Sequence, residues 1–280
     1  MVLCQNSAAV LASSQGLSTA VADAILRDHL YGLELAKRPA EGSLGERSKA
    51  AADRIQAGLV DRKLDVIRSG VAAIEWGFGM QAENGSFPGG CGGMQDASLF
   101  IEAAARSILL MNALAPDSPL AERADGWMQR VHEGARWLAR CVDVDSGTNL
   151  QQEPWTLAAA LGESANATGD RLLRHEAEKC AFIGMKAQRP IDLSRLDAVF
   201  DAMAMAARFF WVCSSDEIRE SIAYTLEATL EQAVAVASES LPTCLDFSSW
   251  AQSLTYGARI LGRPSYSLFA ARIGELRRDS

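Results

Sequence analysis

Residues 81–100 read QAENGSFPGGCGGMQDASLF, and this glycine-rich stretch decides the fold because it separates two segments with a helical pattern. No strand pattern precedes its glycines and no lysine follows them, so a phosphate-binding loop is not expected. Cys91 has no histidine nearby and no second cysteine at metal-ligand spacing, which argues against zinc. Because glycine tolerates positive φ angles, the stretch is best explained as a turn that connects two helices.

On both sides of this turn the chain has the pattern of helices that occur in pairs. Apolar residues recur at spacings of three and four, and no long alternating run indicates a strand. The second member of each pair is apolar nearly all round, which is typical of a buried helix, whereas the first carries a charged face. The charged segments are residues 61–81, 120–141, 170–188 and 215–237, and the apolar ones are residues 96–112, 153–166, 196–212 and 245–262.

The apolar segments begin at acidic residues that recur about every 50 residues, the length of one helical hairpin with its loops: Asp96, Glu153, Asp197 and Asp246. Alternating outer and inner helices of this kind close into a ring or stack as an open solenoid. The inner segments are too apolar to line an open groove. The sequence therefore predicts an all-α fold, an α/α toroid of about five helical hairpins, with the open solenoid as the alternative.

The domain organisation follows from the same pattern, since no linker divides the chain. We expect one domain over residues 1–280, in which residues 1–17 lack regular structure. A first hairpin is expected in residues 18–60, with helices at 18–37 and 46–58. Four outer/inner repeats then occupy residues 61–264, and a last helix covers residues 265–280.

Composition excludes several classes of function. A net charge of −8 and a pI near 5 argue against a nucleic-acid partner. No apolar run approaches the roughly 20 residues of a membrane span, and the start lacks the basic segment of a secretory signal. The six cysteines are widely spaced, so we expect free thiols and a cytoplasmic location. No cofactor or metal is predicted, and the oligomeric state stays open.

The segment WGFGMQAENGSF also carries a family motif. Trp76, Gln81, Gly85 and Phe87 resemble the Q-x-x-x-G-x-W repeat of the squalene-cyclase and prenyltransferase superfamily, with Phe87 in place of Trp. Two degraded copies follow, in AFIGMKAQRP and RWLARCVDVDSG. The resemblance implies a toroid in which the glutamine and the aromatic residue tie an outer helix to the next turn. Polysaccharide lyases and six-hairpin glycosidases share the toroid, so it implies the fold more than the chemistry.

The recurring acids are the candidate catalytic residues, and a structural role competes with that interpretation. An acidic residue at a helix start caps free N–H groups and favours the helix dipole. In a toroid, however, the inner-helix starts converge, and neighbouring carboxyl groups there raise one another's pKa, which suits a general acid. Asp201 lies four residues after Asp197 and shares its helix face, so the two form either an acidic or Mg²⁺-binding pair or ion pairs with Arg195 or Arg208.

The candidate substrate-binding residues come from the same apolar segments: Phe100, Trp155, Phe200, Trp250, Tyr256 and Arg259. Aromatic residues at helical spacing either fill the core or line an apolar pocket that stabilises a cation or stacks on sugars. The three histidines, His29, His132 and His175, fall in the first hairpin or on outer segments. We expect each to be a surface or packing residue.

Three functions remain open. The first is an enzyme that cyclises or isomerises an isoprenoid-like apolar substrate after protonation by an inner-helix carboxyl group. The second is a glycan-active lyase or hydrolase that uses Tyr256, Arg259, Asp246 and Trp250. The third is a non-catalytic toroid that binds or scaffolds a protein partner. An open cleft with tyrosine and arginine would favour the second, and an interior filled by side chains would favour the third.

Overall fold

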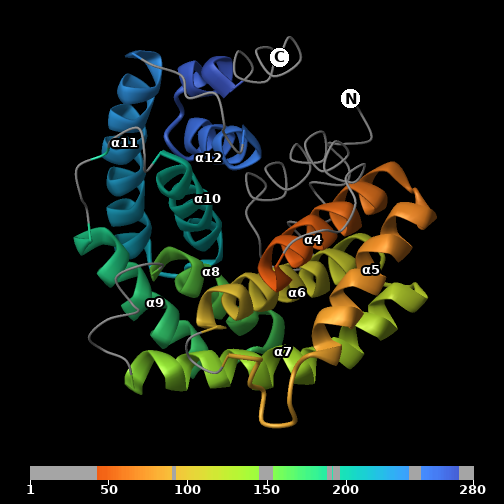
Figure 1. Cartoon of the computed structure of the whole chain (residues 1–280). Helices are drawn as coiled ribbons and strands as arrows, with labels where there is room; N and C mark the ends of the chain where they lie inside the picture. The colour runs from red at the N-terminus through yellow and green to blue at the C-terminus, as the bar shows by residue number, and fades with distance from the viewer. Residues whose placement is uncertain are drawn as a thin grey trace. The chain divides into compact units, whose positions relative to one another are not determined.

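The structure is a computed structural model that describes residues 43–89, 93–144, 154–187, 191, 196–239 and 247–270 (Figure 1). Every regular element in these ranges is a helix, so the all-α prediction is confirmed for this part of the chain. The helices are α4 (Leu44–Asp61), α5 (Leu64–Gly79), α6 (Met94–Leu114), α7 (Pro119–Val144), α8 (Pro154–Thr168), α9 (Arg171–Lys186), α10 (Leu196–Val212), α11 (Asp216–Glu239) and α12 (Phe247–Ile260). Helical residues also occupy positions 264–270.

The chain forms two compact units. Unit 1 comprises residues 1–150 and 160–177, and unit 2 comprises residues 151–159 and 178–280. Helices α8 and α9 therefore each contribute one end to each unit.

Unit 1 is built around α6. Helix α4 packs against both α5 and α6, and α6 packs against α7. Phe100, Ile101 and Ile108 of α6 are completely buried, as is Ile55 of α4. Burial of such side chains contributes about 1.5–3 kcal/mol each, so the packing of α4 against α6 stabilises the unit.

Helix α6 bears on the expectation that no segment spans a membrane. By length and composition alone it is long and apolar enough to cross one. However, 78% of its most apolar window is buried inside the protein. A buried core helix satisfies the same criteria, so this is weak evidence for a membrane span.

In unit 2, α10 packs against both α11 and α12. Phe200 and Phe209 of α10 and Trp250 and Leu254 of α12 fill the space between these helices and are almost completely buried. Helix α11 buries one face only, through residues such as Leu226 and Leu230.

The predicted alternation of half-exposed and buried helices is confirmed within the described residues. Helices α5, α7, α9 and α11 each keep an exposed face, whereas α6, α8, α10 and α12 are mostly buried. The second helix of the first hairpin, expected at 46–58, covers Leu44–Asp61. It starts earlier because Ser43 forms a capping box with Glu46, in which each side chain accepts the other residue's backbone N–H.

Residues 80–89, the described part of the glycine-rich stretch after α5, contain turns, as expected. Within it the backbone N–H of Ala82 donates to Ser86 O at 2.9 Å. Gly85 has a φ of 83°, and a Cβ at this position would overlap the carbonyl group of Glu133 in α7. Only glycine meets both demands without strain. Cys91 lies outside the described residues.

Candidate functional site

Asp96, in the first turn of α6, joins two helices of unit 1. Its Oδ1 accepts hydrogen bonds from Ser43 Oγ at 2.8 Å and from the Gly45 N–H at 3.3 Å, both at the start of α4. A Cβ at Gly45 would lie only 2.8 Å from this oxygen, so the contact depends on the glycine. Asp96 thus supplies a charge and an acceptor to the N-terminus of α4, a favourable position for an anion.

Three candidate residues come together in unit 2. Trp250 donates its indole N–H to Asp197 Oδ1 at 2.8 Å, and its ring stacks on that of Phe200 with centroids 4.2 Å apart. Trp250 and Phe200 have no exposed surface, whereas Asp197 is half-buried. The carboxylate therefore satisfies a polar group that would otherwise be buried without an acceptor.

The other aromatic candidates are packed against further side chains. Phe100 contacts Phe78 edge-on at 5.0 Å and Phe87 at 5.3 Å in unit 1. Tyr256 of unit 2 meets Trp211 edge-on at 4.6 Å. Trp155 of unit 2 is buried against Gly184, where a Cβ would come within 2.6 Å of its ring. Contacts of this kind are typical of aromatic side chains that pack in a hydrophobic core.

The remaining candidates are distributed as follows. Asp201 lies one turn after Asp197 on α10 and is half-buried, and Arg259 is half-buried near the end of α12. Glu153 and Asp246 lie outside the described residues. Because Asp96 belongs to unit 1 and the two α10 aspartates to unit 2, the convergence of the acids stays a prediction.

The glutamine of the family-like motif has a helix-joining role. Gln81 follows α5, and its Nε2 donates to Arg130 O of α7 at 2.9 Å and to Gly85 O at 3.5 Å. Arg130 returns a hydrogen bond from Nε to Gln81 Oε1 at 3.2 Å. Phe87 packs between Phe100 and Trp137. These contacts link the end of α5 to α7, the next half-exposed helix along the chain.

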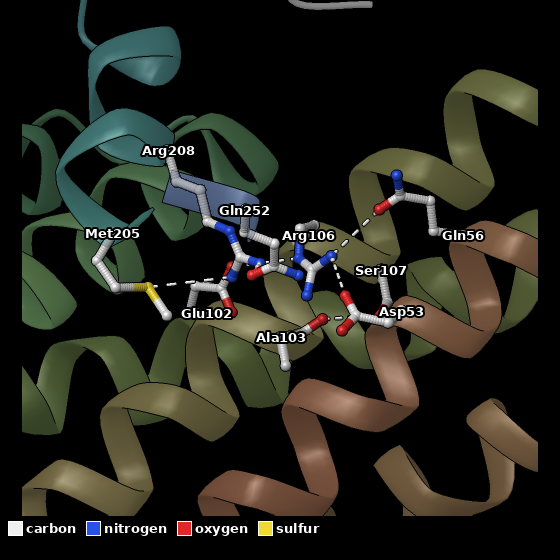
Figure 2. A network of polar contacts seen from close by, with 9 residues as sticks. All are labelled: Asp53, Gln56, Glu102, Ala103, Arg106, Ser107, Met205, Arg208 and Gln252. Atoms are coloured by element: carbon white, nitrogen blue, oxygen red, sulfur yellow. Dashed lines mark hydrogen bonds and ion pairs between the residues drawn. The ribbon is translucent and has the colours of Figure 1, made fainter. Parts of the chain in front are cut away.

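A buried charge network in unit 1 was not predicted from the sequence (Figure 2). Arg106 of α6 donates from Nη1 to Asp53 Oδ1 at 3.0 Å and to Gln56 Oε1 at 3.2 Å, both on α4. Its Nε lies 3.2 Å from Glu102 Oε1, one turn earlier on α6. Burial disfavours the charged guanidinium, but the carboxylates of Glu102, Asp53 and Glu163 outweigh it and raise the pKa of Arg106.

Some signal for this network is present in the sequence. Glu102 and Arg106 have the i, i+4 spacing of a helical ion pair, on an otherwise apolar segment. Their partner Asp53 is about 50 residues away, and no local pattern marks it.

Figure 2 also draws Arg208 of unit 2, whose Nη2 donates to Gln252 Oε1 at 3.5 Å. Arg208 and Gln252 are both buried.

A second polar cluster lies at the turn between α8 and α9 in unit 1. His132 Nε2 is 2.9 Å from Asp170 Oδ2, and Arg136 Nε donates to the same oxygen at 2.9 Å. Asp170 Oδ1 accepts the backbone N–H of Leu172 at 2.9 Å, which caps α9. His132 was expected to be a surface or packing residue, and the sequence offered no link to Asp170, which is 38 residues away.

The ionisation of Asp170 reflects this environment. Partial burial opposes the charged form and raises the pKa of the carboxyl group. Hydrogen bonds from His132, the Leu172 N–H and Arg136 act in the opposite direction and prevail, lowering the pKa of Asp170 to about 2. Asp170 is therefore a permanent anion at neutral pH.

The part of the chain that the structure describes has no group of three or more His, Cys, Asp or Glu side chains arranged to hold a metal ion. Comparisons with protein-family profiles, with curated protein sequences and with solved structures found no match. Functional assignment therefore depends on the geometry of the two units.

Proposed function

We propose that the chain is a binding or scaffold module that works through its outer surface. The observation that carries this proposal is the use of the candidate carboxylates. Asp96 bonds the start of α4, and Asp197 bonds the indole of Trp250. Both side chains act as acceptors between helices, which is a structural use of a carboxylate.

The aromatic candidates support the same proposal. An aromatic pocket for a substrate needs ring faces that a ligand can reach. Phe100, Phe200 and Trp250 have no exposed surface, and each has another ring within 5.3 Å. By contrast, the outer helix α5 exposes large apolar side chains, including Leu64 and Trp76, which are 50% and 43% exposed. Leu64 has an exposed surface that a partner can contact, whereas the Trp76 ring also carries the Arg47 guanidinium at 4.8 Å from its centroid.

For the arrangement of the hairpins we infer the α/α toroid, with the open solenoid as the alternative. The support is the regular alternation of half-exposed and buried helices along the chain. The resemblance of residues 76–87 to the cyclase motif supports it too. A cytoplasmic location is part of the proposal, and its support is the wide spacing of the six cysteines in the sequence.

The proposal is tested with Asp197→Ala in the full chain. The variant leaves the buried indole N–H of Trp250 without its acceptor, so we expect a loss of about 1–3 kcal/mol in the free energy of unfolding. Asp125→Ala, at an exposed position of α7, is the control and should change little. Urea denaturation followed by circular dichroism measures both.

The same proteins are then assayed for product formation from squalene and from isoprenoid diphosphates. We expect no turnover by the native chain. Turnover that Asp197→Asn abolishes, in a variant that retains the native melting temperature, would overturn the proposal in favour of acid-initiated cyclisation.

A further inference from the structure

His132 lies on the outer helix α7 and is held in one orientation by a carboxylate. Its Nε2 is 2.9 Å from Asp170 Oδ2, and about a third of its side chain is exposed. The Asp170 side chain is 10% exposed, and its other oxygen is held by the Leu172 N–H. The imidazole therefore has a fixed anchor and an open side.

The anchor determines which ring nitrogen is basic. An ionised carboxylate only accepts hydrogen bonds, so Nε2 of the neutral imidazole must carry the proton that it donates to Asp170. Nδ1 then holds the free lone pair. Among the described residues Nδ1 has no hydrogen-bond partner. An imidazole oriented by a carboxylate, with its other nitrogen available, is the arrangement of a general base.

Arg136 adds a positive charge to the same group. It lies one helical turn after His132, and its Nε and Nη2 are each 2.9 Å from Asp170 Oδ2. Its side chain is 45% exposed, so the guanidinium is accessible beside the imidazole. Nε and Nη2 are engaged with Asp170, so Nη1 is the donor left to stabilise the oxyanion that develops when a carbonyl carbon is attacked.

We propose that His132, Asp170 and Arg136 form a hydrolytic site for carboxylic esters on the surface of unit 1. This goes beyond the binding role proposed above, because it assigns a reaction to one place on the outer surface. In the first step Nδ1 of His132 takes a proton from water while the water oxygen bonds to the ester carbonyl carbon. The carbonyl oxygen becomes an oxyanion beside Arg136.

In the second step the tetrahedral intermediate collapses and the bond from carbon to the alcohol oxygen breaks. The departing oxygen takes the electron pair and receives the proton from Nδ1. The products are a carboxylic acid and an alcohol, and the imidazole is regenerated. Water is the only co-reactant.

The test is the hydrolysis of p-nitrophenyl acetate by the full chain, compared with His132→Gln. We expect His132→Gln to lower kcat/KM about a hundredfold, the usual contribution of a positioned base. His175→Gln is the matched control. His175 is exposed on α9 in the same unit, and no carboxylate bonds it among the described residues, so we expect it to leave the rate unchanged.

The variant Asp170→Asn tests whether Asp170 orients the His132 imidazole, without removing the cap of α9. Asparagine is as good an N-cap residue as aspartate, so α9 should keep its cap. We expect kcat to fall about tenfold or more with KM nearly unchanged, because the base is less well oriented but the ester still binds. Circular dichroism confirms that each variant has the native helix content.

The proposal is overturned if His132→Gln keeps the native rate, or if His175→Gln lowers it equally. A single stoichiometric acylation without turnover also overturns it. These results are independent of the binding role, which is tested by the stability of Asp197→Ala and by the expected lack of turnover of squalene and isoprenoid diphosphates.

Discussion

Several individual residues of this chain join one helix to another, and Gly85 is the clearest case. Its positive φ and the proximity of the Glu133 carbonyl allow the turn after α5 to lie against α7. Gln81 and Arg130 then close the link with hydrogen bonds in both directions. The local sequence QAENG, which contains Gln81 and Gly85, predicts a turn, but it does not indicate which helix the turn meets.

We expect Gly85→Ala to destabilise the protein by about 1–3 kcal/mol, because alanine is strained at a φ of 83° and its Cβ would overlap the Glu133 carbonyl. Gly79→Ala is the control, since a Cβ there meets no atom within 4 Å. The free energy of unfolding in urea checks both. Equal effects at the two positions would contradict this account of the turn.

The lowered pKa of Asp170 predicts that the free energy of unfolding depends on pH. Its pKa in the folded chain is about 2, below the usual value of 3.8, so the ionised form stabilises the fold. That contribution is complete above the unfolded pKa and is lost as the pH falls from about 4 through about 2. We expect the stability difference between the native chain and Asp170→Asn to shrink over this window.

Acid titration of the unfolding free energy measures this difference. Asp125→Asn, at an exposed position of α7, controls for the change in net charge. A difference that stays constant down to pH 2 would show that the hydrogen bonds to Asp170 do not stabilise its charged form.

At the scale of elements, α4 and α6 are joined by apolar packing and by buried charge. Arg106 is enclosed with Asp53 and Glu102, all nearly or completely buried. Such a network costs desolvation, and its net contribution to stability is small compared with the cost of breaking it. Its geometry requires α4 and α6 to keep one register relative to each other.

We therefore expect Arg106→Met to cost about 3–5 kcal/mol, because it leaves two carboxylates buried without the guanidinium. Arg123→Met is the matched control. Arg123 of α7 pairs with Glu75 of α5 at 2.6 Å, but both side chains are nearly half exposed, so its loss should cost at most about 1 kcal/mol.

Urea denaturation distinguishes the two variants. A small loss for Arg106→Met would mean that Asp53 and Glu102 find other partners or take up protons. In that case the network does not set the register of α4 and α6.

At the scale of the whole molecule, the proposed toroid makes a prediction about size. A closed, compact chain of 280 residues should have a radius of gyration of about 19 Å, whereas an open solenoid is longer and gives a larger value. Small-angle X-ray scattering of the full chain in solution measures it. A clearly larger radius with an elongated distance distribution would favour the solenoid.

The sequence by itself determined the helical class, the approximate bounds of the helices and which of them are buried. These properties repeat along each segment at a spacing of three to four residues, so a local pattern is enough to predict them. It also identified Gln81 and the turn around Gly85, because glycine and its neighbours have conformational preferences of their own.

Only the tertiary structure decided what the polar side chains do. Asp96 bonds the start of α4, Asp197 bonds Trp250, and His132 is oriented by Asp170. The partners in each pair are separated by 38 to 53 residues. A carboxylate accepts from the start of another helix, from an indole or from an imidazole, according to the donor that packing brings to it. That donor is not encoded in the residues around it.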